Sequence, residues 1–260
     1  GNLTPFKARK EDGSSAEVGG IAGIASLVKE IRAENNRKGI RTYLLVAGDV
    51  LQGTPMSTVF QGKPDIEIFN AMGVNAMTVG NHEFDFGLEN FLAIKKTAKF
   101  PIISSNIIWK ESRTLMNDPS TTFPLGGGAV LTVIGATTTE LLVTTAPANV
   151  EKVDVLDSIA TVTENVRKAK GKGPVLLLSH SRFQTDSDIA KANPELLAII
   201  GGHDQILFDP VKYAAGVPVF QAYEKGRYLG RLDLAFNPKT GKAVIEKSKY
   251  IPITPRLKQD

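Results

Sequence analysis

Short apolar runs alternate with amphipathic segments through the first half of the chain. The runs have the length and β-branched content of buried strands, and the segments between them repeat apolar residues at helical spacing. The predicted strands cover 43–47, 76–79 and 101–105, and the predicted helices cover 18–36, 64–72 and 88–96. Strand and helix in alternation predict parallel β-α-β units. Residues 5–17, which are polar and contain Gly and Ser, are expected to form a loop.

The second half of the chain is more varied. Segment 109–122 is loop-like, 140–155 has no clear period, and Asp157 is a predicted N-cap for a helix. Predicted strands cover 129–136, 174–178 and 196–200, and predicted helices cover 158–170 and 186–191. The tail is predicted to form antiparallel strands over 217–222, 228–236 and 243–250, the last two joined as a hairpin. A mostly parallel part followed by an antiparallel part favours an α/β fold with two sheets packed face to face.

Composition limits the classes of function. The 260 residues, 42% of them hydrophobic, suffice for one large domain, which we expect to span 1–260. No run of 18 or more apolar residues predicts a membrane span, and the absence of cysteine excludes disulfides and thiolate ligands. The net charge of +4 comes from scattered Lys and Arg, which suits a small anionic substrate better than a nucleic-acid polymer.

Potential metal ligands follow the predicted strands. The chain has three histidines, His82, His180 and His203, and each comes just after an apolar run. Asp49 follows the run 43–47 in the same way. Because the carboxyl ends of parallel strands meet at one edge of a sheet, we expect these side chains to converge there. Carboxylate, amide and imidazole ligands at one edge predict a centre for hard or borderline divalent ions.

The densest motif is Gly-Asn-His-Glu-Phe-Asp at 80–85. Asn81 offers a neutral oxygen, His82 a nitrogen that can bind metal or carry a proton, and Asp85 a carboxylate that can fix the imidazole tautomer. The alternative interpretation is a polar turn with a capping Asn and a surface His. The repeated placement of His after strands elsewhere in the chain favours the functional interpretation.

These motifs resemble those of the calcineurin-like metallophosphoesterases, and more closely the catalytic domain of the 5'-nucleotidase and UDP-sugar hydrolase branch. The resemblance rests on Gly-Asp-Val-Leu-Gln-Gly at 48–53, the motif at 80–85, Ser-His at 179–180 and Gly-Gly-His-Asp-Gln at 201–205. It implies a four-layer α/β/β/α sandwich of two mixed sheets flanked by helices. It also implies two divalent ions, drawn from Zn, Mn, Mg or Ca, and a periplasmic or extracellular location.

Two departures from the family pattern shape the expectations. The family's first motif, Asp-x-His, belongs one residue before Gly1, so we expect an upstream core strand to carry it; a metal-poor binding domain is the alternative. Gln205 stands where many members have a final His. We expect Asp49 to bridge the two ions, Asn81, His180 and His203 to complete one site, and Gln205 to join the other.

The expected reaction is hydrolysis of a nucleotide phosphomonoester by in-line attack of a metal-bound water on phosphorus. His82, oriented by Asp85, is expected to bind the phosphate beside Asn81 and stabilise charge on it in the transition state. Cyclic-nucleotide phosphodiesterase and sugar-nucleotide pyrophosphohydrolase activities are the enzymatic alternatives on the same centre. In this branch a C-terminal domain grips the nucleobase, so we expect either a monomer or a partner domain of that kind outside these residues.

Overall fold

A mixed six-stranded sheet forms one half of the computed structural model, which describes residues 2–9 and 13–254. Its strand order is β12-β13-β11-β10-β8-β7. The bounds are β7 (Ser120–Gly126), β8 (Ala129–Thr137), β10 (Val175–His180), β11 (Ala198–Gly201), β12 (Lys212–Ala214) and β13 (Val217–Phe220). The four inner strands run parallel, and β7 and β12 pair antiparallel at the two edges. All of the inner strands therefore deliver their carboxyl ends to the same side.

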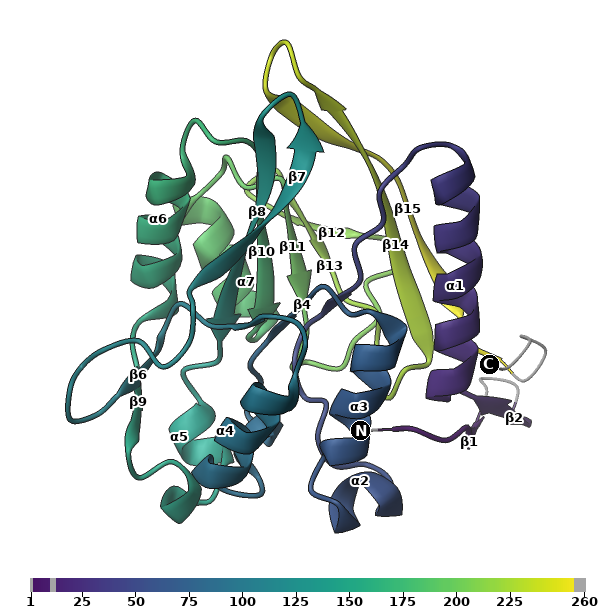
Figure 1. Cartoon of the computed structure of the whole chain (residues 1–260), viewed down its shortest axis with the longest axis vertical. Coiled ribbons are helices and arrows are strands. Elements are labelled where there is room, and N and C mark those ends of the chain that lie inside the picture. The colour runs from purple at the N-terminus through teal and green to yellow at the C-terminus, as the bar shows by residue number, and fades with distance from the viewer. Residues whose placement is uncertain (1, 10–12, 255–260) are drawn as a thin grey trace.

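Two helices, α6 (Ser158–Ala169) and α7 (Phe183–Ala192), cover the outer face of this sheet (Figure 1). Val162 and Val166 of α6 and Ile189 of α7 are buried in one apolar cluster with the strands. The side chain of Asp157 accepts a 2.7 Å hydrogen bond from the backbone N–H of Ala160. The predicted N-cap is thus confirmed, and it sets where α6 begins.

The second sheet is parallel, with the order β3 (Leu45–Val46), β4 (Ala76–Thr78) and β5 (Ile102–Ile103). The helices of this half are α1 (Ile21–Arg37), α2 (Pro55–Val59), α3 (Lys63–Met72) and α4 (Leu88–Thr97). Ile66 of α3 and Phe91 of α4 pack with Met77 of β4 in a second apolar cluster. Ala76 and Ile103 face the six-stranded sheet across a third cluster. The predicted four-layer α/β/β/α arrangement is confirmed.

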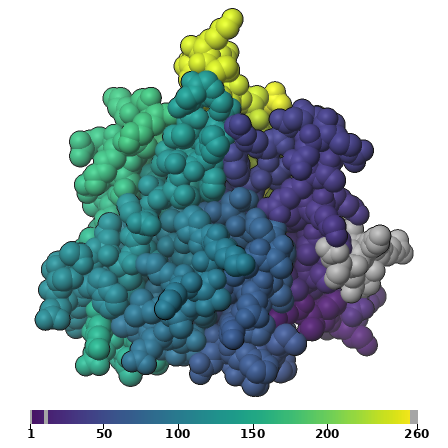
Figure 2. All heavy atoms as spheres, viewed as in Figure 1, coloured from purple at the N-terminus to yellow at the C-terminus, as the bar shows by residue number. Residues whose placement is uncertain are grey.

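The tail forms the predicted hairpin from β14 (Tyr228–Asn237) and β15 (Lys242–Pro252). Figure 2 shows its tip, in yellow, projecting beyond the rest of the molecule. The prediction for 217–222 was wrong in part, because β13 pairs parallel with β11 and antiparallel only with β12. The unpredicted strand β12 takes the edge position, which leaves β13 inside the sheet.

The expected loop at 5–17 is instead a two-stranded hairpin of β1 (Phe6–Arg9) and β2 (Ser15–Val18), with 10–12 outside the described residues. Alternate residues of both strands are part-buried, and Phe6 pairs with Val18. Each strand carries only two apolar side chains, so the period-2 signal was too short to recognise in a segment with many polar residues.

The middle of the chain also contains more regular structure than predicted. Elements here are η1 (His82–Phe84), β6 (Ile107–Trp109), α5 (Leu141–Thr144), η2 (Pro147–Asn149) and β9 (Val153–Val155). Strands β6 and β9 pair antiparallel, with Ile107 opposite Val155. This pairing joins segments more than forty residues apart, so neither local period nor local propensity reports it.

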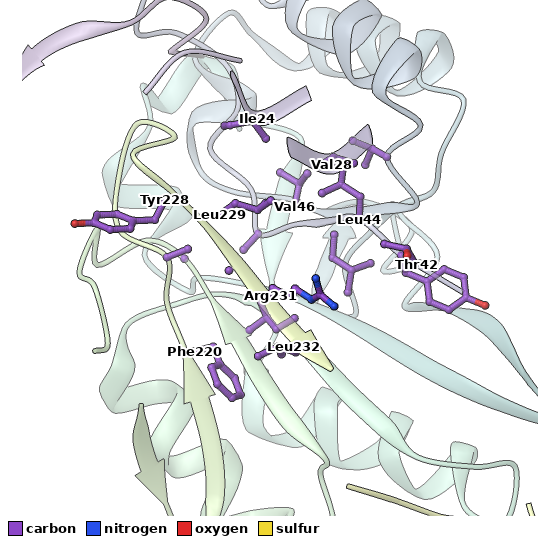
Figure 3. Close-up of a pocket in the computed structure, with 18 of the residues that line it drawn as sticks. Ile24, Val28, Thr42, Leu44, Val46, Phe220, Tyr228, Leu229, Arg231 and Leu232 are labelled. Atoms are coloured by element: carbon purple, nitrogen blue, oxygen red, sulfur yellow. The ribbon is translucent and has the colours of Figure 1, made fainter. Parts of the chain in front are cut away.

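A cavity of about 1390 Å³ lies between β3 and β14. In Figure 3, Leu44 and Val46 line it from the β3 side, and Leu229 and Leu232 line it from the β14 side. Within the described part of the chain, β3 pairs with β4 alone and β14 with β15 alone. The two strand edges that border this cavity therefore have no strand partner among the described residues.

Candidate metal centre

Four potential ligands lie together at the carboxyl edge of the two sheets. Asp49 follows β3, Asn81 follows β4, His180 ends β10 and His203 follows β11. Nε2 of His180 lies 3.1 Å from Oδ2 of Asp49 and 3.3 Å from Oδ1 of Asn81. Nδ1 of His203 lies 3.3 Å from the same nitrogen. The facing of the two sheets thus brings together four residues that span more than 150 positions of the sequence.

The donor set fits a divalent ion. One ligand atom from each of Asp49, His180 and His203 lies within 4.8 Å of the other two. His180 is buried, with 1% exposure, and its Nδ1 lies 2.6 Å from the carbonyl oxygen of Ala47. Since that nitrogen must donate to a carbonyl, the lone pair of the neutral ring sits on Nε2 and faces the cluster. A carboxylate, an amide oxygen and two imidazoles suit hard or borderline divalent ions.

Gln205 lies at the exposed end of the cavity, next to the carboxyl edge of the two sheets. It lies two residues beyond His203, its side chain is exposed, and its backbone is left-handed with φ 56°. It lines the cavity between β3 and β14, as do Asp49 and His203. No hydrogen bond joins its amide to the four clustered ligands among the contacts of the described residues. The fold therefore brings Gln205 near the same opening but not into the contacting cluster.

His82 and Asp85 form a close pair beside the cluster. Nδ1 of His82 lies 2.5 Å from Oδ2 of Asp85, and the backbone N–H of His82 donates to Oδ1 of Asp49 at 3.0 Å. The hydrogen bond that His82 donates to the carboxylate of Asp85 raises the pKa of His82 to about 9, although burial opposes this. Gln52 also donates to Asp85, a contact that the sequence analysis did not anticipate. His82 is thus half-exposed and protonated at neutral pH, and Asp85 holds its ring through Nδ1.

Glu83 has a structural role that the sequence motifs did not indicate. Its side chain is completely buried, and its two oxygens accept three backbone hydrogen bonds. Oε1 accepts from Val50 at 2.6 Å, while Oε2 accepts from Asp49 at 2.9 Å and from Gly80 at 2.6 Å. Burial raises the pKa of Glu83, and these donors act in the opposite direction. Glu83 therefore ties the turn after β3 to the turn after β4.

Close backbone approach explains two glycines in these turns. A Cβ on Gly80 would lie 2.4 Å from Oδ1 of Asp49, and a Cβ on Gly48 would lie 2.8 Å from the nitrogen of Gly80. Gly48 also has φ +79°, a left-handed conformation that favours glycine. The two turns can touch only because neither residue carries a side chain.

Burial and contacts between neighbouring ligands act in opposite directions on the charges of Asp49 and His180. Burial disfavours charge on both His180 and Asp49, but in the metal-free protein the hydrogen bond that the protonated Nε2 of His180 donates to Asp49 raises the pKa of His180 and lowers that of Asp49. Burial and the nearby His180 lower the pKa of His203. A neutral His203 and an ionised Asp49 are the forms that bind metal ions.

Comparison with known proteins identifies the family. The family model for calcineurin-like phosphoesterases matches residues 17–207, which is most of the chain and includes the clustered ligands. The chain belongs to the calcineurin-like phosphoesterase family. Membership implies bound divalent metal ions, in agreement with the donor set described above.

Relatives of this phosphoesterase include 5'-nucleotidases. It is 31% identical to the snake venom 5'-nucleotidase of Gloydius brevicauda, over 93% of this chain and 44% of that protein. It is 32% identical to the 5'-nucleotidase of Homo sapiens, over 94% of this chain and 46% of that protein. The 5'-nucleotidase precursor from Thermus thermophilus superposes with a TM-score of 0.83 at 25% identity, over 100% of this chain and 54% of that one. The chain thus spans about half the length of these relatives or less.

Proposed function

We propose that this phosphoesterase hydrolyses nucleotide phosphomonoesters with two divalent ions. The observation that carries the proposal is the convergence of Asp49, Asn81, His180 and His203, whose donor atoms meet around Nε2 of His180. The preference for nucleotides is supported by the 5'-nucleotidases among its relatives. When bound, the ions would lower the pKa of a coordinated water and neutralise charge on the phosphoryl group.

Each ligand has a proposed place. Asn81, His180 and His203 would hold one ion together with Asp49, because ligand atoms of Asp49, His180 and His203 lie within 4.8 Å of one another and Oδ1 of Asn81 lies 3.3 Å from Nε2 of His180. Asp49 would also bind the second ion, because Oδ2 lies against His180 while Oδ1, which accepts a hydrogen bond from the backbone N–H of His82, keeps a further lone pair for an ion. Gln205, at the open rim, contributes its amide oxygen to the second site.

His82 acts on the substrate in this proposal, and Asp85 orients it. The ring of His82 is 43% exposed, whereas the side chain of Asp85 is 13% exposed and lies behind it. A protonated imidazole at this position would donate a hydrogen bond to a phosphoryl oxygen and stabilise the charge that develops there. The same proton could pass to the leaving oxygen.

The cavity between β3 and β14, with an unpaired strand edge on each side among the described residues, supports the proposal of a further strand upstream of Gly1. Asn2 and Leu3 line this cavity, so a segment that precedes them would enter it directly. Running parallel to β3, such a strand would reach the cluster at its carboxyl end. We propose that it pairs with both free edges and carries the Asp-x-His ligands of the second ion.

A comparison of proteins with and without this segment tests the strand. The 260-residue chain is expected to bind at most one ion tightly, and a version extended by about ten native upstream residues is expected to bind two. Metal analysis of both samples measures this. Two tightly bound ions in the shorter protein would exclude the upstream ligands.

The location proposed is periplasmic or extracellular. It is supported by the venom enzyme among the relatives. None of the helices in the described ranges has both the length and the apolar character needed to cross a membrane.

The experiment that tests the function measures phosphate release from nucleoside monophosphates, with and without added Mn²⁺ or Zn²⁺. Asp49→Ala is expected to lose metal and activity together. His82→Ala is expected to keep its metal and lose about 100-fold or more in turnover, the usual cost of a lost acid or oxyanion donor. Glu151→Gln, at an exposed glutamate outside these motifs, is the control.

Three results would contradict the proposal. One is the absence of ion-dependent phosphate release from any nucleoside monophosphate by the complete protein. Another is equal metal loss in Asp49→Ala and His82→Ala, which would make His82 a ligand. Faster turnover of cyclic nucleotides or sugar nucleotides, measured as formation of the nucleoside monophosphate because neither reaction releases inorganic phosphate, would assign the centre to one of those substrates instead.

A further inference from the structure

A second group of charged residues lies against the outer side of His203. Glu140 precedes α5, Arg182 precedes α7 and Asp204 follows His203, so three neighbouring strand ends contribute. Nε2 of His203 lies 3.2 Å from Oε2 of Glu140, and Nε of Arg182 donates to the other oxygen, Oε1, at 2.8 Å. A terminal guanidinium nitrogen of Arg182, Nη1, lies 3.8 Å from Oδ1 of Asp204. Both oxygens of Glu140 are therefore occupied.

We propose that Glu140 is a positioning residue, which fixes the tautomer and ring orientation of His203 for metal binding. The inference rests on the proposed metal centre. It adds a residue that neither the strand-end pattern nor the motifs of the sequence indicate.

The tautomer follows from the chemistry of the two contacts. An ionised carboxylate only accepts hydrogen bonds, so Nε2 of His203 must carry the proton that Glu140 receives. The neutral ring then has its lone pair on Nδ1, the nitrogen that lies 3.3 Å from Nε2 of His180 inside the cluster. Without Glu140, the ring could exchange tautomers or rotate, and Nδ1 would present a lone pair only part of the time.

Glu140 itself lies outside the ligand cluster. The acidic and imidazole groups that gather within 4.8 Å in the described structure are Asp49, His180 and His203. The side chain of Glu140 is 35% exposed, and His203, with 11% exposure, stands between it and the other ligands. Its effect on a bound ion would therefore pass through His203.

Arg182 keeps the carboxylate in place. Its hydrogen bond, followed by that of His203, lowers the pKa of Glu140, which keeps the acceptor ionised at neutral pH. The guanidinium is 57% exposed and screened by water, so its loss should matter less than the loss of Glu140. We expect Arg182→Ala to have a smaller effect on metal affinity than Glu140→Ala.

Nitrogen NMR of the metal-free protein tests the positioning directly. In the wild type, His203 is expected to show the tautomer protonated on Nε2. Glu140→Ala should produce a mixture of tautomers, whereas Glu140→Gln, which retains an acceptor oxygen, should largely restore the wild-type signal. Glu151→Gln, an exposed glutamate outside the cluster, is the matched control. This measurement needs neither a bound ion nor a substrate.

Calorimetric titration with Zn²⁺ or Mn²⁺ alone supplies the second readout. Glu140→Ala should weaken binding by about 10- to 100-fold, as for other partners of metal-binding histidines, and Glu140→Gln should remain within about threefold of wild type. An unchanged tautomer, or unchanged affinity in Glu140→Ala, would overturn the inference. Because the tautomer is read without metal or substrate, a protein that failed to hydrolyse nucleotides would still decide the role of Glu140.

Discussion

Replacing Glu83 with glutamine removes one negative charge and one acceptor oxygen from the link between the two ligand-bearing turns. The isosteric side chain fills the same space, so the change creates no cavity. Glutamine has a single acceptor oxygen, whereas the structure presents three backbone donors from Val50, Asp49 and Gly80. At least one buried N–H must then face the amide NH₂ without an acceptor.

The expected cost follows from these contacts. A hydrogen bond to a charged group contributes roughly 1.5–3 kcal/mol, and a neutral one about 0.5–1.5 kcal/mol. The variant loses one of the three bonds and weakens the other two. Part of this loss is offset because a buried charge next to Asp49 is removed, the same desolvation that raises the pKa of Glu83. We expect the free energy of unfolding to fall by about 2–4 kcal/mol.

Denaturant unfolding in the presence of a chelator measures this cost without any contribution from bound metal. Hydrogen exchange of the Val50 and Gly80 amides should become faster in Glu83→Gln, because these are the donors that lose their charged acceptor. Glu111→Gln, at an exposed glutamate in a turn, is the control and should change stability by less than about 0.5 kcal/mol. If Glu83→Gln were as stable as this control, Glu83 would not be what holds the two turns together.

Three further predictions concern pH and backbone contact. In the metal-free protein His82 should titrate near 9, and Asp85→Asn should return its pKa toward 6.5 by NMR, since the hydrogen bond that His82 donates to Asp85 is the largest cause. Because the pKa of His82 is raised in the folded state, the pair stabilises the fold fully below about pH 6.5, and that contribution is lost as pH rises through about 9. An unchanged pKa would assign the shift to Asp49 instead. Burial raises the pKa of Asp186 from 3.8 to about 7, so the folded protein holds this proton more tightly than the unfolded chain does. The free energy of unfolding should therefore fall by roughly 4 kcal/mol as the pH rises from 3.8 to about 7. Asp186→Asn should abolish that part of the pH dependence in chelator-treated protein, and an identical pH profile would show that Asp186 ionises freely. Gly80→Ala should weaken Zn²⁺ binding at least tenfold by calorimetry, because the new Cβ would lie 2.4 Å from Oδ1 of Asp49 and this carboxylate must move. Wild-type affinity would mean that the turn after β4 adapts to the side chain.

Local pattern determined much of the architecture. The period of apolar residues located the buried strands that carry the ligands, and α1, α3, α4 and α6 begin and end within a few residues of the predicted bounds. Parallel strands share one carboxyl edge, so the sequence also predicted that Asp49, Asn81, His180 and His203 would lie together. Their roles as ligands remain proposals. Such inferences succeed because they depend on residues close in sequence and on one rule of sheet topology.

Only the tertiary structure decided the features that depend on contacts between distant segments. The pairing of β6 with β9, the parallel partner of β13 and the cavity between β3 and β14 all follow from how the sheets meet. The same holds for the roles of two carboxylates, Glu83 inside the motif at 80–85 and Glu140 outside every motif. Glu83 reaches a turn 34 residues away, and Glu140 reaches His203 across 63 residues. The sequence shows which acidic residues are present, but burial and the positions of distant donors decide which of them hold the site in place.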